Sequence, residues 1–212
     1  MTEMQKNYYD KRAALLVKNL QNRHFEAYYY PTKEDALRKA LELIPAGASV
    51  GWGGTMSAQQ IGLIDAVRAG EYRPIDRDAC TTAEEREESM RRCLMSDTFI
   101  SGANALSLDG QMVNIDGNGN RVAAIVYGPK QVIVIAGMNK VEDTLEAAVT
   151  RARTVAAPIN EQRFLGDTPC ARTGICADCR SEACICNHIV ITRHTRPVGR
   201  IQFVLVGEDL GF

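Results

Sequence analysis

The chain has 212 residues, and 45% of them are hydrophobic, which is enough to bury one sizeable core, so we expect a single domain spanning residues 1–212. Its 25 lysine and arginine residues nearly balance 26 acidic ones, and the net charge of −1 argues against a nucleic-acid partner. The N-terminus lacks the apolar segment of a signal peptide and no run of about 18 apolar residues follows, so we expect a cytoplasmic protein without a membrane partner.

The first part of the chain predicts helices and a strand in alternation. Apolar residues at helical spacing predict a helix from about Glu3 to Leu20, and the following F-E-A-Y-Y-Y predicts a strand. Residues Thr32 to Ile44 predict a second helix, because Thr32 suits an N-cap and apolar residues recur on one stripe.

The middle of the chain continues this alternation. The segment A-S-V-G-W-G-G-T-M-S predicts a strand, a glycine-rich turn and a helix on which Ser57 and Gln60 are placed as a capping box. We further expect a strand at 72–75, a solvated helix at 82–93 and a strand at 98–102.

A hairpin and a central strand follow. The segment A-L-S-L-D-G-Q-M-V-N-I predicts two strands joined at Asp109-Gly110, a dipeptide that suits a type I′ turn. The segment Q-V-I-V-I-A-G is apolar on both faces, as a central parallel strand should be. We also expect a short helix in R-V-A-A-I-V-Y-G-P, a helix from Val141 to Val155, and two closing strands, I-V-I-T-R and I-Q-F-V-L-V. Together these elements predict an α/β fold with a mostly parallel sheet flanked by helices.

The glycine-rich turn is the first candidate site. Glycine lets a backbone turn sharply and approach a ligand, and the N–H groups that begin the next helix attract an anion. The spacing matches neither the phosphate loop of NTPases nor the dinucleotide-binding fingerprint. We therefore expect a phosphate or carboxylate at Gly51, Gly53, Gly54 and Thr55, and a tight turn without a ligand is the alternative.

The polar loop N-I-D-G-N-G-N-R is the second candidate site. Its asparagines and glycines tolerate unusual backbone conformations, and Arg121 has the forked geometry that pairs with a carboxylate or phosphate. We expect Asn114, Asn120 and Arg121 to bind the ligand and Asp116 to act as an acid or base. Lys140 follows the central strand, so it should lie at the carboxyl edge where open α/β folds bind ligands. The alternatives are a turn whose asparagines bond their own backbone and a solvated lysine.

The third candidate site is the cysteine-rich segment C-A-R-T-G-I-C-A-D-C-R-S-E-A-C-I-C. Two residues separate one pair of its cysteines, a spacing that lets both thiolates converge on one metal. A reducing cytosol disfavours structural disulfides, so we expect either zinc or an iron-sulfur cluster, and free thiols are the alternative. A zinc ion or a cubane cluster needs four ligands, so the five cysteines include one spare thiol, and His188 is a substitute ligand. The expected ligands are the five cysteines of this segment. They are Cys170, Cys176, Cys179, Cys184 and Cys186.

Three segments taken together, S-V-G-W-G-G-T-M-S, L-D-G-Q-M-V-N-I-D-G-N-G-N-R-V-A-A and I-V-I-A-G-M-N-K, resemble the LUD domain family, named for lactate utilisation. The resemblance extends from the N-terminal helix to the final G-E-D-L-G-F. It implies a fold similar to the ribose-5-phosphate isomerase, glucosamine-6-phosphate deaminase and CoA-transferase group. It also implies a bacterial component of L-lactate oxidation that works with iron-sulfur partner proteins. By loop position, Asp109, Asp116 and Lys140 are the nearest counterparts of the acidic residues and lysine that isomerase and transferase relatives use.

Three functional hypotheses follow. The leading one is a component of lactate or related organic-acid utilisation that binds a small anionic metabolite between the two polar loops and a metal centre through its C-terminal cysteines. The second is a sugar-phosphate or CoA-ester enzyme without redox chemistry, and the third is a non-enzymatic redox or metal-responsive regulator. None of the three histidines lies in the glycine-rich regions, so the sequence supports neither a Ser-His-Asp nor a Cys-His mechanism. Whether the chain is catalytic on its own, and whether it forms a homo-oligomer, stays open.

Overall fold

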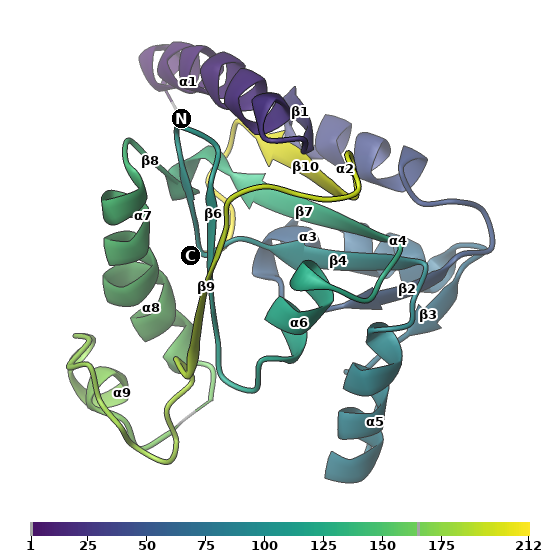
Figure 1. Cartoon of the computed structure of the whole chain (residues 1–212), viewed down its shortest axis with the longest axis vertical. Helices are drawn as coiled ribbons and strands as arrows, with labels where there is room; N and C mark the ends of the chain where they lie inside the picture. Colours follow the sequence, from purple (N-terminus) through teal and green to yellow (C-terminus); the bar gives the residue numbers. More distant parts are fainter. Residues whose placement is uncertain (1, 165) are drawn as a thin grey trace.

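The computed structural model describes residues 2–164 and 166–212. Within these residues the strands form a six-stranded sheet of order β1-β10-β7-β4-β2-β3 and a four-stranded sheet of order β8-β5-β6-β9 (Figure 1). The strands are β1 (Glu26–Tyr30), β2 (Ser49–Trp52), β3 (Arg73–Ile75), β4 (Thr98–Gly102), β5 (Ala105–Ser107), β6 (Met112–Asp116), β7 (Gln131–Gly137), β8 (Val141–Glu142), β9 (His188–Thr192) and β10 (Ile201–Val206). The helices are α1 (Glu3–Asn22), α2 (Lys33–Glu42), α3 (Met56–Gln60), α4 (Leu63–Ala69), α5 (Ala83–Cys93), α6 (Asn120–Val126), α7 (Leu145–Arg151), α8 (Ala157–Glu161) and α9 (Pro169–Thr173), with a 3-10 turn η1 (Met138–Lys140) and a π-helical turn η2 (Ala152–Ala156).

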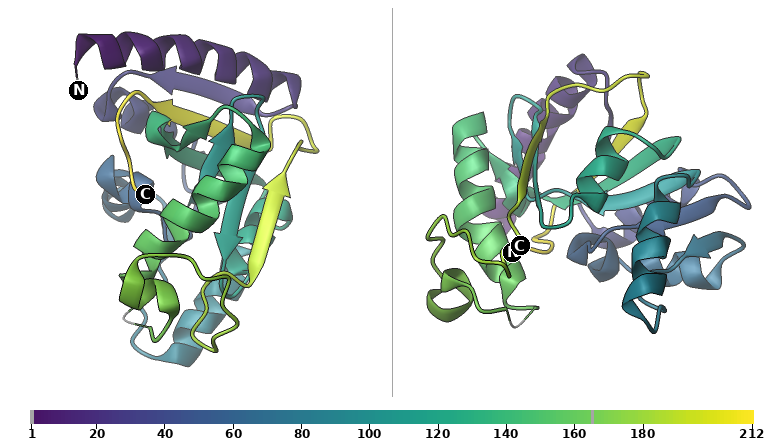
Figure 2. Two further views of the ribbon diagram at one scale, coloured as in Figure 1. Left: turned by 90° about the vertical axis from the view of Figure 1, so that its left-hand side faces the viewer. Right: turned by 60° about the horizontal axis from the view of Figure 1, so that its bottom comes forward.

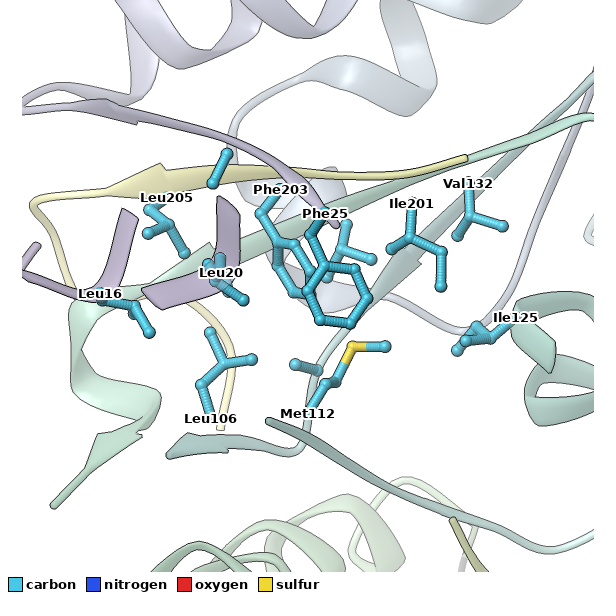
Figure 3. Close-up of a cluster of buried hydrophobic side chains, with 14 of the residues drawn as sticks. Leu16, Leu20, Phe25, Leu106, Met112, Ile125, Val132, Ile201, Phe203 and Leu205 are labelled. Atoms are coloured by element: carbon cyan, nitrogen blue, oxygen red, sulfur yellow. The ribbon is translucent and has the colours of Figure 1, made fainter. Parts of the chain in front are cut away.

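The larger sheet confirms the predicted α/β fold, because every neighbouring pair of its strands is parallel. Its central strand β7 is apolar on both faces, as predicted. Val132 and Val134 point into one hydrophobic cluster, and Ile133 and Ile135 point into the other. Figure 3 shows the first cluster, where Phe25 and Phe203 meet edge to face with ring centroids 5.2 Å apart. Each fully buried side chain of this kind stabilises the fold by about 1.5–3 kcal/mol.

Four layers follow from these clusters (Figure 2). Helices α2, α3 and α4 cover one face of the larger sheet through the second cluster. Helices α1 and α6 and the smaller sheet cover the other face through the first cluster. The far face of the smaller sheet packs against the helical segment α7-η2-α8 through alanines such as Ala148 and Ala152. Strands β5 and β6 of the smaller sheet are therefore buried on both faces, between the larger sheet and a helical layer, whereas the edge strand β9 is mostly exposed.

The two closing strands lie in different sheets. Strand β10 lies between β1 and β7 and is parallel to both, whereas β9 is antiparallel to β6 at the edge of the smaller sheet. Local patterning predicted both strands but did not distinguish their partners, since pairing depends on long-range packing.

The predicted helix from Val141 to Val155 begins too early. Val141 and Glu142 form the short strand β8, which pairs with Leu106 and Ser107 of β5. The helix starts after Thr144, whose hydroxyl accepts a hydrogen bond from the Ala147 backbone N–H at 3.2 Å. The pairing of Val141 and Glu142 with β5, and the N-cap that Thr144 provides, thus override the helical periodicity of residues 141–144.

Two local predictions about turns were also wrong. At the hairpin, only Gly110 has a positive φ, of 92°, and Ser107 accepts from the Gly110 N–H at 2.8 Å, so the loop is a type I turn followed by a left-handed glycine. At α3, the N-cap is Thr55 rather than Ser57, because the Thr55 hydroxyl accepts from the Ala58 N–H at 3.3 Å. Ser57 lies inside the helix, where its hydroxyl is free to meet another side chain.

No helix in the described part of the chain combines the length and the apolar character that crossing a membrane requires.

Candidate functional site

A cavity of about 420 Å³ lies at the carboxyl ends of the parallel strands. We call it the carboxyl-edge pocket. Residues that directly follow β2, β3, β4 and β7 line it, which is the position where ligands bind in open α/β sheets. The loop between β6 and α6, the end of α8 and the Ile185 side chain close it from the side of the smaller sheet. The main lining residues are Gly54, Thr55, Arg77, Asp78, Asn104, Asp116, Asn120, Arg121, Lys140 and Arg163.

The lining of this pocket is strongly basic although the chain as a whole is nearly neutral. Five basic side chains line it against two acidic ones, Asp78 and Asp116. The basic residues are Arg77, Arg86, Arg121, Lys140 and Arg163. Cations gathered in a concave, poorly solvated site raise the local potential and attract an anion. The carboxyl-edge pocket is therefore suited to a small anionic ligand.

Arg121 holds the walls of the pocket together. Its Nη1 donates to Asn114 Oδ1 at 2.6 Å and to the Gly102 carbonyl at 3.3 Å, and its Nη2 donates to the Ile115 carbonyl at 2.6 Å and to Asn104 Oδ1 at 3.1 Å. Its Nε lies 3.4 Å from Asp116 Oδ2. Burial lowers the pKa of Arg121, while Asp116 opposes this shift and Arg77 adds to it. The predicted ligand-binding arginine thus uses its donors on the protein and contributes charge and rigidity to the pocket.

Arg77 has the hydrogen-bonding capacity that Arg121 lacks. Its Nε is buried and has no hydrogen-bond partner in the described residues, and Asp78 Oδ1 lies 3.6 Å from it. Burial lowers the pKa of Arg77, with Arg86 acting in the same direction and Asp78 against it. The forked guanidinium of Arg77 lies on the pocket lining, where its other nitrogens can pair with a bound anion. Arg77 is therefore the strongest candidate for a direct ligand contact.

Lys140 is the buried ammonium of the site. It lies on η1, directly after β7, and lines the same cavity as Thr55 and Asp116, as the sequence predicted from its place after a central strand. Its Nζ donates to Ser57 Oγ and to the Ala103 carbonyl, each at 3.1 Å. Burial, with the charges of Arg151 and Arg121, lowers the pKa of Lys140 to about 7.

The glycines of the β2 turn divide into packing and pocket positions. A Cβ atom on Gly51 would lie 2.6 Å from Cys93 Sγ, and one on Gly53 would lie 2.7 Å from Arg121 Cδ, so both glycines permit close packing. Neither belongs to the cavity lining, whereas Gly54 and Thr55 do. Two of the expected anion-binding N–H groups are engaged, since Gly53 N donates to Ile100 O at 3.1 Å and Thr55 N donates to Gly53 O at 2.9 Å.

The residues of the polar loop also separate by role. Asp116 and Asn120 line the cavity, and Asp116 Oδ1 accepts from the Gly119 N–H at 2.8 Å. Asn114 is fully buried on β6 beneath Arg121 and is not part of the lining. His188 lies against Gly119, since a Cβ atom built on Gly119 would lie 3.0 Å from His188 Nε2. The loop therefore supports the pocket mainly through Asp116 and Asn120.

The five cysteines of the C-terminal segment line one second cavity of about 70 Å³, which we call the cysteine pocket. They are Cys170, Cys176, Cys179, Cys184 and Cys186. Burial and then the neighbouring sulfurs of Cys184, Cys176 and Cys170 raise the pKa of the Cys186 thiol to about 12. Among residues 2–164 and 166–212, no three His, Cys, Asp or Glu side chains converge tightly enough to hold a single metal ion.

Glu161 is the buried acidic residue of the cysteine pocket, whose lining also includes the exposed Asp178. Glu161 is fully buried and lines the cavity, and its Oε1 accepts from Thr168 Oγ1 at 3.0 Å. Its Oε2 is buried without a hydrogen-bond partner in the described residues. A buried carboxylate oxygen without a partner is costly and would be compensated by a cation.

The two pockets share a wall. Ile115 and Ile185 line both of them, so one layer of side chains separates the carboxyl-edge pocket from the cysteines. Asn187 Nδ2 bridges the two regions by donating to the Gly117 carbonyl at 3.0 Å and to the Cys184 carbonyl at 3.3 Å. Metal chemistry at the cysteines would therefore take place next to a ligand in the larger pocket.

Sequence reasoning missed Arg77, Arg163 and Asn104. Arg77 follows the predicted strand at 72–75, so the rule that placed Lys140 at the carboxyl edge could have identified it. Arg163 had no such signal, because it reaches the pocket from the end of α8 through tertiary packing. Asn104 accepts from both Arg121 and the Ile115 N–H through its Oδ1, a role that only the fold reveals.

Taken together, the parallel sheet and its basic pocket define an α/β protein with a candidate anion site at the carboxyl edge. A model of the LUD domain family matches residues 13–206, so the chain belongs to this family, which is linked to lactate utilisation. No curated protein matches the chain.

A solved structure with the same fold covers nearly the whole chain, and two others are similar to about half of it. A DUF162 family protein from Deinococcus radiodurans is 11% identical, with a TM-score of 0.53 over 93% of this chain and 97% of that chain. Ribose 5-phosphate isomerase A from Neisseria gonorrhoeae is 19% identical over 53% of this chain and 54% of its own, with a TM-score of 0.34. The ribose 5-phosphate isomerase A of Methanocaldococcus jannaschii is 18% identical over 53% of this chain and 55% of its own, also with a TM-score of 0.34.

Proposed function

We propose that this protein binds a small organic anion of the lactate class in the carboxyl-edge pocket and acts as a component of lactate or related organic-acid utilisation. The observation that carries this proposal is Arg77, whose buried Nε has no hydrogen-bond partner in the described residues of a pocket that five basic side chains line. The family link to lactate utilisation supports the choice of an organic acid over other anions. In this proposal Arg77 and the Gly54 turn hold the carboxylate, and Asp116 is the candidate acid or base.

Isothermal titration calorimetry with L-lactate, pyruvate, ribose 5-phosphate and inorganic phosphate tests the proposal. We expect an organic acid to bind and Arg77→Gln to weaken it by about 10- to 100-fold, because a hydrogen bond to a charged group contributes about 1.5–3 kcal/mol. Arg91→Gln is the matched control, because it removes the same charge from an exposed ion pair with Glu87 on α5.

Each outcome of this titration decides between hypotheses. Binding of an organic acid that is equal in wild type and Arg77→Gln would contradict the assignment of Arg77. Binding of ribose 5-phosphate alone would favour the alternative of a sugar-phosphate enzyme that uses the same pocket. Absence of binding by all four anions would refute the carboxyl-edge pocket as an anion site.

We further propose that the cysteine pocket holds an iron-sulfur cluster. Thiolates around one zinc ion lie about 4 Å apart, since each Zn–S bond is about 2.3 Å, whereas the ligands of a cluster bind different irons and lie farther apart. All five cysteines line this one cavity, which provides the four thiolates that a cluster needs. A bound cluster would supply one-electron transfer next to the carboxyl-edge pocket.

Iron, zinc and acid-labile sulfide analysis of protein purified without oxygen tests this second proposal. We expect iron and sulfide in stoichiometric amounts together with a visible absorption band, and loss of both in the double variant Cys176→Ser/Cys179→Ser. Cys80→Ser is the control, because Cys80 is remote from the cysteine pocket. Stoichiometric zinc would make the segment a structural staple, and the absence of any metal would leave reactive thiols.

A further inference from the structure

Lys140 has no acidic partner in the described part of the chain. Its Nζ donates only to neutral acceptors, the Ser57 hydroxyl and the Ala103 carbonyl, and it forms no ion pair among residues 2–164 and 166–212. Its side chain is 4% exposed, yet it contributes to the lining of the carboxyl-edge pocket. A buried ammonium without a counter-charge is costly, so this environment favours the neutral amine.

The charges around Lys140 act in the same direction. Arg121 on α6 and Arg151 on α7 repel its ammonium, and each of these arginines has one acidic neighbour of its own. Asp116 lies 3.4 Å from Arg121 Nε, and Glu142 lies 3.7 Å from Arg151 Nε. With the pKa of Lys140 at about 7, about half of the protein carries a neutral amine at pH 7. For an ordinary lysine this fraction is roughly a thousandfold smaller.

A neutral lysine amine beside cations is an activated nucleophile for carbonyl carbon. The pocket supplies the complementary feature, because Arg77, Arg163 and the Gly54 turn lie on the same lining as Lys140. A 2-oxo acid matches both features, since its carboxylate suits the arginines and its adjacent carbonyl suits the amine. A 2-hydroxy acid such as lactate has the same carboxylate but offers no carbonyl carbon.

We propose that Lys140 captures a 2-oxo acid in the carboxyl-edge pocket as a covalent imine. The Nζ lone pair forms a C–N bond to the carbonyl carbon, the C–O π bond breaks, and the oxygen takes up a proton that the nitrogen releases. Loss of water from this carbinolamine then breaks the C–O bond and leaves a C=N bond to Lys140. The step consumes one amine and one ketone, releases one water and needs no oxidant. It rests on the proposed anion site and assigns that site a substrate class.

Reductive trapping tests the proposal. The full-length protein is incubated with pyruvate and sodium cyanoborohydride, digested and mapped by mass spectrometry. We expect one reduced pyruvate adduct on the peptide that contains Lys140, saturable with pyruvate and suppressed by L-lactate. Labelling should rise with pH through about 7 rather than through 10.5, the ordinary value for lysine.

Two lysine variants provide the controls. Lys140→Arg keeps the charge but cannot form an imine, and Lys140→Met keeps the length without the charge, so both should lose the adduct while circular dichroism confirms folding. Lys130→Arg changes an exposed lysine that pairs with Asp97, and the adduct should persist in it.

The possible results separate this inference from the function on which it rests. Calorimetric binding of pyruvate without an adduct at Lys140 would overturn the imine and leave the anion site standing. Equal labelling of Lys130 and Lys140 would also overturn it, because the reaction would then be unselective. Absence of binding by any organic acid would overturn both proposals together.

Discussion

The carboxyl-edge pocket and the cysteine pocket share a wall, but the chain builds them in different ways. The first draws its lining from loops spread between Gly54 and Phe212, and Arg121 joins several of these loops through hydrogen bonds. The second takes all its cysteines from residues 170–186, where α9 is the only helix within the described residues and strands are absent. The first region is thus organised before a ligand binds, whereas we expect the second to depend on the proposed metal centre for its order.

The largest expected effect tests the rigid region. Arg121→Met removes the donors that join Gly102, Asn104 and Ile115, and it leaves Asp116 as a buried carboxylate without its partner. We expect the free energy of unfolding to fall by about 3–5 kcal/mol, the usual cost of removing one member of a buried ion pair. Urea denaturation followed by circular dichroism measures it. Arg91→Gln, on the exposed face of α5, should change stability by less than about 0.5 kcal/mol. A loss below about 1 kcal/mol for Arg121→Met would show that the pocket walls hold without it.

Removal of the metal tests the second region. We expect chelation under mild reducing conditions to speed amide hydrogen exchange in residues 170–187 by at least about tenfold. This corresponds to a decrease of about 1.4 kcal/mol in the free energy of local opening. Exchange in β7 and β10 should not change, because both strands lie in the middle of the larger sheet. Hydrogen exchange with mass spectrometry, before and after chelation, distinguishes the two regions. Equal acceleration of hydrogen exchange in the cysteine segment and in β7 and β10 would show that the cysteine segment does not depend on the metal more than the sheet does.

The pH dependence of binding tests the charge of the carboxyl-edge pocket. A bound anion favours the ammonium of Lys140, so above pH 7 binding takes up a proton. We expect affinity for L-lactate to fall as pH rises above about 7, by up to about tenfold per pH unit, and Lys140→Met to flatten this slope. Calorimetry in buffers of different ionisation enthalpy measures the proton uptake directly. Proton release on binding would have the wrong sign for a lysine whose pKa is lowered in the free protein.

The same group affects the stability of the unliganded protein. Between pH 7 and 10.5 the unfolded chain holds the Lys140 proton that the folded chain has lost, so this residue makes stability rise with pH in that window. Wild type and Lys140→Met should therefore differ in the slope of stability against pH. Parallel slopes in the two proteins would contradict the assigned pKa.

The smallest expected effect concerns the contact between the two regions. Asn187→Ala removes the side-chain bridge from Gly117 to Cys184. Because Asn187 is exposed, we expect a loss of only about 0.5 kcal/mol of stability, at the low end for a hydrogen bond. Binding of an anion and loss of metal should then become less dependent on each other, which calorimetry of the metal-loaded and metal-free variant measures. If anion binding and metal loss stayed equally dependent on each other in Asn187→Ala, the contact that links the two pockets would lie elsewhere, for instance at Ile185.

Most of the fold was predictable because its signals are local. Strand β7 has apolar residues on both faces, which indicated a central parallel strand, and the Thr32 N-cap marked the start of α2. The start of α7 was not predictable in the same way, since Val141 has a helical pattern but finds a strand partner in Leu106. Local propensity yields to long-range pairing at such positions.

The candidate site was predictable in its location more than in its roles. The rule that ligands bind at the carboxyl edge predicted that Thr55, Asp116 and Lys140 lie near one another, and the three line one cavity. The same rule did not reveal that Gly51 and Gly53 are packing positions, because their neighbours Cys93 and Arg121 come from α5 and α6. Roles depend on which donors are already satisfied, and a sequence pattern does not report this.

By itself the sequence determined the parallel α/β core, the two polar loops and a cysteine segment with metal-ligand spacing, because periodicity, turn chemistry and ligand spacing are all local properties. Only the tertiary structure decided that Arg121 supports the pocket, and that among the described residues the Nε of Arg77 lacks a hydrogen-bond partner and the buried Lys140 lacks a counter-charge. It also decided that the cysteines lie one side-chain layer from the carboxyl-edge pocket. The physical reason is that desolvation, hydrogen-bond satisfaction and electrostatic repulsion depend on neighbours that are distant in the chain and close in space.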